Sequence, residues 1–321
     1  MTQKIVAGIE TRRVAPYVQQ KTSVPFTNVV RHFLLFLLIL ENTAVAGDTS
    51  DQVVRIMGNR SGTAVVVEVR SGHVLAAYHP DVAARRLARP GSAFKPFTLL
   101  ALLQSGKLSP TDSLACRRNL RVGKHDLSCT HPKTGPLQAV SALAYSCNDF
   151  FATLGSRLTA LELQTTFTKA GFASPTGLMP DEAAGFIHVA HGDEERQLQA
   201  VGEGDMKVTP LEMLAAYRAI ALRRADPNAT AADRVVFQGL EEATLYGMAR
   251  LAALSELKVA GKTGTPKTDD GHWTNGWFAG YAPADKPEIV VVVFLERGTG
   301  PGDAAPVAGE IFSAWWKAEQ K

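Results

Sequence analysis

The sequence predicts an α+β fold in which an antiparallel sheet is built from both ends of the chain, with helices between the two halves. Short apolar runs of strand length, bounded by turn residues, occur near residue 65 and again beyond residue 257. The middle of the chain instead repeats its apolar residues at helical spacing. With 45% apolar and 20% charged residues among 321, the composition is that of a globular protein and excludes disordered and fibrous classes.

Five strands are predicted. Residues 63–69 and 74–78 form a hairpin whose turn is Arg70-Ser71-Gly72-His73. Three more strands follow near the other end of the chain, separated by turns rich in Asp, Gly and Pro: 258–265, 277–281 and 288–295. Because the hairpin and these runs lie far apart in the sequence, the sheet joins the two ends of the chain.

Four helices are predicted from apolar periodicity and cap residues. One of them opens with a capping box in which Thr209 is the N-cap, Pro210 the first helical residue and Glu212 the third. The last helix, 304–319, repeats apolar residues at helical spacing and should pack one face on the sheet. The two remaining predicted helices are 92–104 and 137–145.

The first 46 residues have the pattern of a secretion signal. Basic residues precede the apolar run 33–40, and Ala44-Val45-Ala46 supplies a small-residue cleavage site. Eight apolar residues are too few for a membrane-spanning helix, which needs about 20, so a cleaved signal is preferred over a permanent anchor. We therefore interpret 1–46 as a signal peptide cleaved after Ala46 and 47–321 as an exported domain, periplasmic or in the cell envelope.

The charge distribution does not favour nucleic acid as a partner. The formal charge of the whole chain is +3, and removal of residues 1–46 takes away five basic and two acidic residues, which leaves a neutral domain. This domain has no basic run interleaved with aromatic residues. It also has no Gly-rich phosphate loop, so nucleotide chemistry is not supported, and no cofactor is expected.

Three cysteines are present, and an exported chain is free to oxidise them. Cys116 and Cys129 flank a predicted hairpin that turns near Val122-Gly123-Lys124. A symmetric fold about this turn places them opposite each other, so we expect a Cys116–Cys129 disulfide, with two unpaired thiols as the alternative. Cys147 has no evident partner and is expected to be a small buried side chain.

The first candidate catalytic pair is Ser92 with Lys95, a Ser-x-x-Lys sequence at the start of a predicted helix. Residues three apart on a helix share a face, so the amine can take the proton of the hydroxyl. A serine needs such a base, and a lysine serves if burial or a neighbouring cation lowers its pKa. Since Ser-x-x-Lys is common by chance, an ordinary solvated helix start is the alternative.

Two further motifs match in order. Ser146-Cys147-Asn148 offers a second hydroxyl for proton transfer and an amide to hold a substrate amide. Lys262-Thr263-Gly264-Thr265 lies on a predicted strand, where the glycine lets a ligand come close and the cation with the two hydroxyls can bind a carboxylate. Each is weak alone, but the ordered set of Ser-x-x-Lys, Ser-x-Asn and Lys-Thr-Gly is typical of penicillin-binding proteins and serine β-lactamases.

The chain resembles the transpeptidase domain of the class B penicillin-binding proteins, which assemble peptide cross-links of bacterial cell wall. The resemblance covers roughly residues 60–317 and includes, besides the three motifs, the segments 202–211 and 277–283. It implies a five-stranded antiparallel sheet covered by helices, an all-helical lobe beside it, and an active site between them. Few residues of 47–321 precede the first strand, so we expect a catalytic unit without the N-terminal pedestal domain usual in class B members.

The resemblance also implies a mechanism. Ser92 attacks the carbonyl between the two terminal D-alanines of a peptidoglycan stem peptide, and Lys95 accepts the serine proton. Ser146 with Lys262 then passes a proton to the departing D-alanine, which leaves an acyl-enzyme. Transfer to an amine makes the protein a D,D-transpeptidase, and transfer to water makes it a D,D-carboxypeptidase.

Binding roles follow from the same resemblance. The backbone N–H groups of Ser92 and Thr265 form the oxyanion hole, where one donor is worth about 10²–10³ in rate. Thr263 and Thr265 hold the terminal carboxylate, and Asn148 holds the peptide amide. The implied partners are peptidoglycan stem peptides, β-lactams as covalent inhibitors and a further cell-wall synthesis protein.

Two other classes of function stay open. A β-lactam sensor or cell-wall-binding module would keep the same motifs. A serine β-lactamase needs a base for deacylation, and no glutamate in the segment 160–205 lies in a recognisable form of the loop that carries it in class A enzymes. Class D enzymes usually have an apolar residue where Asn148 stands.

No metal site is predicted. His188 and His191 are three residues apart and could share a helix face, but no third ligand group stands near them in a recognisable pattern. We therefore interpret them as loop histidines.

Overall fold

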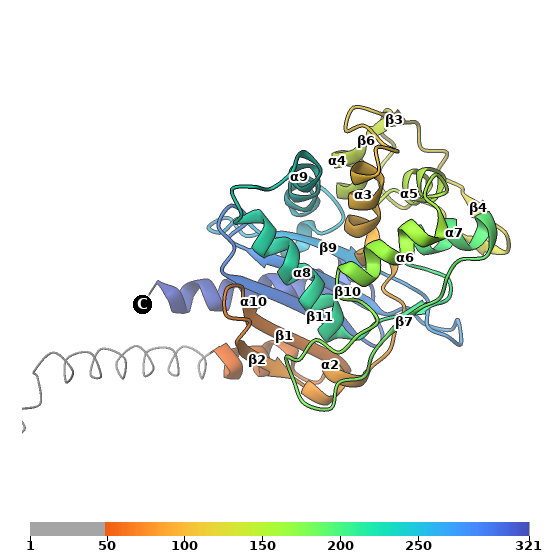
Figure 1. Cartoon of the computed structure of the whole chain (residues 1–321). Helices are drawn as coiled ribbons and strands as arrows, with labels where there is room; N and C mark the ends of the chain where they lie inside the picture. The colour runs from red at the N-terminus through yellow and green to blue at the C-terminus, as the bar shows by residue number, and fades with distance from the viewer. Residues whose placement is uncertain (1–48, 321) are drawn as a thin grey trace, which may run out of the picture. The chain divides into compact units, whose positions relative to one another are not determined.

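The computed structural model describes residues 49–320, and its centre is a five-stranded antiparallel sheet (Figure 1). The strand order is β2-β1-β11-β10-β9, with every neighbouring pair antiparallel. The N-terminal hairpin therefore lies directly beside the last strand, which confirms the predicted sheet built from both ends of the chain. The strands are β1 (Gly62–Glu68), β2 (Val74–Tyr78), β9 (Ala260–Gly264), β10 (Gly276–Ala282) and β11 (Ile289–Leu295).

Both faces of this sheet are buried, because successive side chains of a strand point to opposite faces and both sets are apolar here. In β1, Val65 and Val67 belong to one core together with Leu211 of helix α8 (Pro210–Arg224). Val66 belongs to a second core together with residues of helix α10 (Ala305–Glu319). The sheet is thus the middle layer between α8 and α10.

The remaining long helices form a lobe beside the sheet (Figure 1). They are α3 (Lys95–Gln104), α4 (Ala139–Ala144), α5 (Asn148–Gly155), α6 (Ala160–Lys169), α7 (Gly192–Ala200) and α9 (Ala231–Leu245). Short elements connect them: α2 (Pro80–Arg85), η1 (Gly91–Phe94), η2 (Arg250–Ala252), η3 (Gly300–Ala304), β3 (Ser113–Leu114), β4 (Arg121–Val122), β5 (His125–Asp126), β6 (Leu137–Gln138), β7 (Phe186–Ile187) and β8 (Met206–Lys207). The predicted α+β architecture with a helical lobe is confirmed.

An aromatic cluster at the base of α3 joins the lobe to the sheet layer. The ring centroid of Phe94 lies 4.6 Å from that of Phe167 in α6 and 4.3 Å from that of Phe172. Phe97 stacks edge-on against Tyr217 of α8, with centroids 5.7 Å apart. Because Phe94 immediately precedes Lys95, this packing fixes the start of α3.

The predicted helix 92–104 is in fact two elements. Ser92 lies in the 3₁₀ turn η1, and the α-helix begins only at Lys95. The reason lies in the backbone at Gly91, the first residue of η1. Gly91 has φ +52°, a conformation that favours glycine, and its N–H donates to the carbonyl of Gly202 at 2.8 Å. A similar correction applies to 137–145, whose first two residues form β6 before α4 begins.

The capping box at Thr209 is confirmed and extends further than predicted. The Glu212 N–H donates to the Thr209 hydroxyl at 3.1 Å, and the Glu212 carboxylate accepts from the Thr209 N–H at 2.7 Å. The same carboxylate accepts from the backbone N–H groups of Ser174 at 3.0 Å and Gly185 at 2.9 Å. A fully buried acid therefore holds the segment between α6 and α7 against the start of α8.

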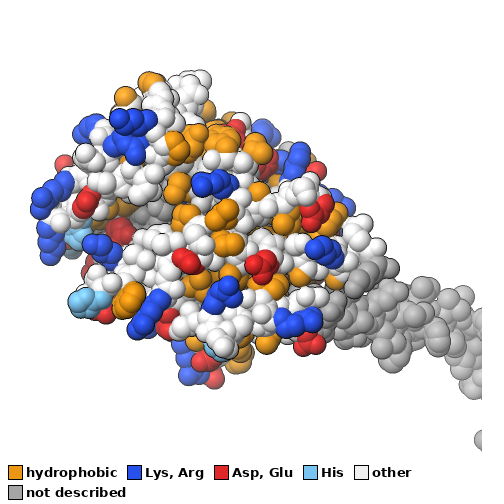
Figure 2. Space-filling view, turned by 180° about the vertical axis from the view of Figure 1, so that it is seen from behind, with side chains coloured by type: hydrophobic (Ala, Val, Ile, Leu, Met, Phe, Trp, Pro, Cys, Tyr) orange, Lys and Arg blue, Asp and Glu red, His pale blue; other side chains and the backbone are white. Residues whose placement is uncertain are grey.

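The surface carries both signs of charge. Figure 2 shows Lys and Arg side chains interspersed with Asp and Glu on one face, with apolar side chains between them. None of the helices in residues 49–320 combines the length and the apolar character needed to cross a membrane. The predicted signal peptide, 1–46, lies outside the described residues.

We expect Glu212→Ala to lower the free energy of unfolding by about 3 kcal/mol, because it leaves buried backbone N–H groups without their acceptor. Urea unfolding followed by tryptophan fluorescence measures this change. Glu310→Ala, at an exposed position of α10, is the matched control and should stay within about 0.5 kcal/mol of the unaltered protein. Equal stability of the two variants would contradict the assigned role of Glu212.

Candidate active site

The three predicted motifs meet at the hydroxyl of Ser146. The Lys262 ammonium group on β9 donates to Ser146 Oγ at 2.8 Å, and that of Lys95 at the start of α3 donates to the same oxygen at 3.2 Å. Lys95 also donates to the Ser146 carbonyl at 2.7 Å. Residues from three separate parts of the chain thus form one connected set of proton donors and acceptors.

Asn148 and Phe151 complete the surroundings of Lys95. Asn148 Oδ1 accepts from Lys95 Nζ at 2.5 Å, and the ring centroid of Phe151 lies 5.5 Å from the same nitrogen. The Lys95 side chain is fully buried, and this burial lowers its pKa to about 8. An amine with this pKa is partly neutral near neutral pH and can act as a base.

Lys262 is also fully buried, and its pKa is held well below the usual range by desolvation first and by the charge of Lys95 second. Its ammonium group is otherwise bonded to the carbonyl of Thr263 at 3.0 Å. Two lysines within hydrogen-bonding distance of one hydroxyl disfavour the doubly charged state. The pair is therefore suited to passing a proton through Ser146.

The backbone at Ser146 is unusual, and this geometry places its hydroxyl between the two lysines. Ser146 has φ +57°, in the left-handed region that residues other than glycine seldom adopt. It follows the C-terminal end of α4, and the next residue, Cys147, is the N-cap of α5. A strained residue at the junction of two helices is a frequent feature of functional sites.

Ser92 lies in the 3₁₀ turn η1, three residues before Lys95. Its side chain is half-buried, and its carbonyl accepts the N–H of Lys95, as expected within a 3₁₀ turn. Within residues 49–320 the Ser92 hydroxyl has no hydrogen-bond partner, whereas the Ser146 hydroxyl bonds to both lysines. Hydrogen bonds between a nucleophile and its base are often long in the absence of substrate, so this does not exclude Ser92 as the nucleophile.

Gly264 brings β9 against η1. A Cβ at this position would lie 2.6 Å from the Pro90 carbonyl oxygen and 3.1 Å from the Ala93 nitrogen, which no side chain tolerates. The glycine of the Lys-Thr-Gly motif therefore permits the approach of strand and turn. This approach sets the N–H of Thr265 close to the turn that carries Ser92.

The two threonines of the motif differ in their surroundings. The Thr265 hydroxyl accepts from the Gly300 N–H at 2.9 Å, at the start of η3. The Thr263 hydroxyl donates to the carbonyl of Met248 at 3.4 Å, and its side chain is buried on the strand face opposite Lys262. The structure thus brings Lys262 together with Ser146 but does not bring the Thr263 hydroxyl to them.

Glu203 is an acidic residue near Lys95 that the sequence analysis did not single out. Burial raises its pKa to about 7, against the opposing effect of the positive charges on Arg89 and Lys95. It lies between Gly202, whose carbonyl bonds to Gly91, and Gly204. Its position within the segment 202–211 was visible in the sequence, but its partial burial and its electrostatic interaction with Lys95 were not.

The cysteines differ from the sequence prediction. The hairpin itself is confirmed, with Arg121 of β4 paired to Asp126 of β5. However, all three cysteines are free thiols, so the predicted Cys116–Cys129 disulfide is absent from the structure. The expectation that Cys147 is a small buried side chain is confirmed, and its sulfur lies 3.8 Å from that of Cys129. The fold brings the end of the hairpin onto the start of α5, a contact that the local spacing of cysteines does not reveal.

The loop that carries the hairpin is tied to α5 by an ion pair. Arg117 donates through its guanidinium and its backbone N–H to Asp149, whose carboxylate is fully buried. Burial opposes ionisation of Asp149, but the hydrogen bonds and charge of Arg117 keep its pKa below the usual value. Asn148 Nδ2 also donates to the carbonyl of Ser128 at 3.3 Å. The loop therefore contacts the two residues that follow Cys147.

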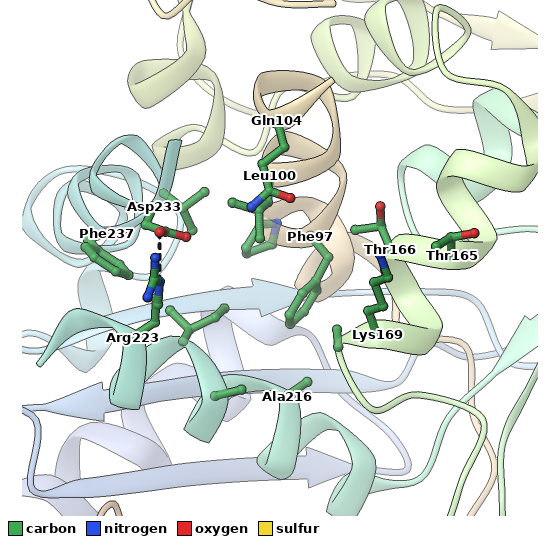
Figure 3. Close-up of a pocket in the computed structure, with 15 residues that line it drawn as sticks. Phe97, Leu100, Gln104, Thr165, Thr166, Lys169, Ala216, Arg223, Asp233 and Phe237 are labelled. Atoms are coloured by element: carbon green, nitrogen blue, oxygen red, sulfur yellow. Dashed lines mark hydrogen bonds and ion pairs between the residues drawn. The ribbon is translucent and has the colours of Figure 1, made fainter. Parts of the chain in front are cut away.

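A separate cavity of about 350 Å³ lies between α3, α6, α8 and α9 (Figure 3). Phe97, Leu100 and Phe237 give it apolar walls, and the Arg223–Asp233 ion pair lies at its side. None of the motif residues lines it. We therefore do not assign the predicted chemistry to this cavity.

Comparisons with known proteins identify a family and several relatives. The family model for the penicillin binding protein transpeptidase domain matches residues 62–315. Stage V sporulation protein D of Bacillus subtilis (strain 168) is 30% identical over 265 residues, which are 69% of this chain and 41% of that protein. Peptidoglycan D,D-transpeptidase FtsI of Escherichia coli (strain K12) is 27% identical over 298 residues, 78% of this chain and 50% of that protein. The chain spans half or less of the length of these relatives.

Solved structures agree on the fold. The D,D-transpeptidase domain of a peptidoglycan glycosyltransferase from Eggerthella lenta has a TM-score of 0.75 with this chain at 22% sequence identity. The superposition covers 85% of this chain and 81% of that domain. With the family model matched across most of the described residues, the chain belongs to the penicillin-binding protein transpeptidase domain family.

Proposed function

We propose that the protein is a serine acyltransferase that acts on the D-Ala-D-Ala ends of peptidoglycan stem peptides, as a D,D-transpeptidase or D,D-carboxypeptidase. The observation that carries this proposal is the convergence of Lys95 and Lys262 on Ser146 Oγ beside the half-buried Ser92. Membership in the family supports it, as do relatives named for D,D-transpeptidase activity. We also propose that β-lactams acylate the same serine.

Acylation begins with the Ser92 hydroxyl and the neutral Lys95 amine. As Ser92 Oγ bonds to the carbonyl carbon between the two D-alanines, its proton moves to Lys95 Nζ. The peptide C–N bond then breaks, and the leaving amine takes a proton from Ser146 Oγ, which is replenished by Lys262 at 2.8 Å. The products are a Ser92 ester and free D-alanine. Lys95 has gained one proton, Lys262 has lost one, and Ser146 is unchanged, so the protons balance.

The substrate is held by the groups around this proton path. The backbone N–H groups of Ser92 and Thr265 are our proposed oxyanion hole, supported by the close packing of β9 on η1 at Gly264. Asn148 holds the peptide amide. Thr265 and the Lys262 charge bind the terminal carboxylate, and Thr263 joins them only if its bond to Met248 opens.

Location and partners are part of the same proposal. The substrate lies outside the cytoplasmic membrane, in agreement with a secretion signal at 1–46 and a periplasmic or cell-envelope domain at 47–321. A further cell-wall synthesis protein is the proposed partner, as the resemblance to the family implies.

Hydrolysis is a second candidate, favoured by one observation. Glu203 is a half-buried acid whose charge interacts with that of Lys95, and its pKa is raised to about 7, which suits a base that activates water. Hydrolysis of the stem-peptide ester gives a D,D-carboxypeptidase, and rapid hydrolysis of a penicilloyl ester gives a β-lactamase. A D,D-carboxypeptidase is compatible with the main proposal, whereas a β-lactamase would replace it.

We expect the full chain to release D-alanine from a stem pentapeptide, and to form a cross-linked product when an amino acceptor is added. Mass spectrometry of the products separates transfer from hydrolysis. Ser92→Ala should abolish both, while Ser109→Ala, at an exposed turn, should change neither. Absence of D-alanine release from correctly folded protein would refute the enzyme proposal in favour of a sensor or binding module.

A fluorescent penicillin should label the unaltered protein and leave Ser92→Ala unlabelled, and the adduct should persist for minutes or longer. An efficient β-lactamase would instead clear it at an enzyme-like turnover of about 1–10³ per second. Intact-mass spectrometry after removal of excess penicillin measures the decay. If the unmodified mass returns rapidly in the unaltered protein and slowly in Glu203→Gln, the protein is a β-lactamase with Glu203 as its base.

The acylation rate should rise with pH and level off above about pH 8. The base form of Lys95 is the neutral amine, and burial lowers its pKa to about 8, so each pH unit below this value reduces the rate about tenfold. Stopped-flow acylation between about pH 6 and pH 9 measures the profile. Lys133→Met, at an exposed loop position, should keep it, and Lys95→Met should remove activity at every pH. A flat profile would argue against Lys95 as the base.

A further inference from the structure

Four side chains that the proposed reaction does not use converge next to the active site. Cys116, Cys129, His131 and Cys147 each present a ligand atom, and these atoms lie within 4.8 Å of one another. Across residues 49–320 they form the one such group of three or more His, Cys, Asp or Glu side chains. His188, which the sequence analysis weighed, pairs with Asp205 instead.

The ring of His131 is oriented as a metal ligand would be. Its Nδ1 lies 2.7 Å from the carbonyl oxygen of Pro132, so Nδ1 carries the proton and donates. This tautomer leaves Nε2 with a free lone pair. Nε2 is buried, since the residue is only 2% exposed, and it has no hydrogen-bond partner within the described chain. Metal-bound histidines usually donate their second N–H to a carbonyl or carboxylate in this way.

The distances fit a tetrahedral ion. Zinc with Zn–S bonds of about 2.3 Å places neighbouring sulfurs about 3.8 Å apart. The sulfurs of Cys129 and Cys147 are separated by 3.8 Å. The remaining ligand atoms need to move by no more than about 1 Å to reach the same geometry.

We propose that Cys116, Cys129, His131 and Cys147 bind one structural Zn²⁺ ion, against the sequence prediction of no metal site. Three thiolates and one neutral imidazole form a closed set with no position left for water, which is typical of structural and not catalytic zinc. Binding releases three thiol protons to solvent and leaves a complex of net charge −1. Thiolate ligands favour Zn²⁺ over Mg²⁺ or Ca²⁺, which prefer oxygen.

A disulfide explains these observations less completely. Three sulfurs cannot all be paired within one chain, and any single disulfide leaves the third thiol and the buried Nε2 of His131 without a partner. A buried nitrogen that lacks a partner destabilises the folded protein, and coordination to zinc removes this penalty. The ion is therefore the occupant that satisfies all four side chains.

The position of this site gives it a consequence for the proposed reaction. Cys147 stands between Ser146, which bonds to both lysines, and Asn148, which bonds to Lys95. The other three ligands come from the loop 116–131. An ion at this point fastens the loop to the α4–α5 junction and holds Ser146 in its left-handed conformation.

The test is metal content, which does not depend on catalytic activity. The full chain, isolated under reducing conditions and reconstituted with ZnCl₂, should contain one zinc per chain after gel filtration. Substitution with CoCl₂ should give the intense visible bands of tetrahedral cobalt thiolate. A chelator should lower the Tm of the unaltered protein.

Variants assign the ligands. Cys116→Ser, at the most exposed of the four positions, and His131→Gln should each weaken zinc binding by at least about tenfold. His125→Gln, a histidine in the same hairpin but outside the group, should bind zinc like the unaltered protein. If Cys116→Ser and His131→Gln retain unchanged zinc affinity, the ligand set is refuted.

Two other results would overturn the proposal: reconstituted protein without bound zinc, or non-reducing peptide maps of freshly isolated protein that show a disulfide among these cysteines. Labelling of the same samples with fluorescent penicillin keeps the two proposals apart. A labelled protein without zinc refutes the metal site alone, and a zinc protein that never labels refutes only the proposed function.

Discussion

The burial of two lysine side chains beside a single serine hydroxyl is the interaction on which the active site depends. Removal of an ammonium group from water costs on the order of several kcal/mol, so each lysine must find acceptors or lose its proton. Lys95 finds them in the Ser146 carbonyl and Asn148, and Lys262 finds them in Ser146 Oγ and the Thr263 carbonyl. These acceptors are too few to stabilise two fully charged ammonium groups. The pKa of each lysine therefore falls, and a neutral amine suited to act as a base becomes accessible.

This arrangement requires three chain segments to come close together. In each segment, one residue has the backbone conformation or the small size that permits the approach. Gly91 adopts a positive φ where the chain enters η1, and Gly264 permits β9 to lie against that turn. At Ser146 a residue with a side chain takes the left-handed conformation, because its hydroxyl is needed there. The cost of this conformation, about 1 kcal/mol or more, is offset by bonds to both lysines.

A second layer of residues supports the first. The loop 116–131 reaches the α4–α5 junction through the Arg117–Asp149 ion pair, the Asn148–Ser128 hydrogen bond and the contact between Cys129 and Cys147. On the other side of the site, Glu212 holds the segment between α6 and α7 against α8 through three backbone N–H groups. Both supports are polar contacts in buried places, where a missing partner is costly, so they fix one conformation.

The sequence by itself determined the elements and the order of the motifs. Runs of β-branched residues predicted the strands, and the Thr209 capping box predicted the start of α8. The motifs predicted Ser92, Lys95, Ser146, Asn148 and Lys262 as candidate site residues. These signals are local, because periodicity and capping depend on neighbouring residues. Only the tertiary structure decided that Lys95 and Lys262 share one hydroxyl, that Ser92 lies in a 3₁₀ turn and that Thr263 faces away. It alone also decided that the half-buried Glu203 interacts electrostatically with Lys95. It also decided that Cys147 meets Cys129 and His131. The physical reason is that burial and long-range contact set pKa values and partners, and neither is encoded in the spacing of residues along the chain.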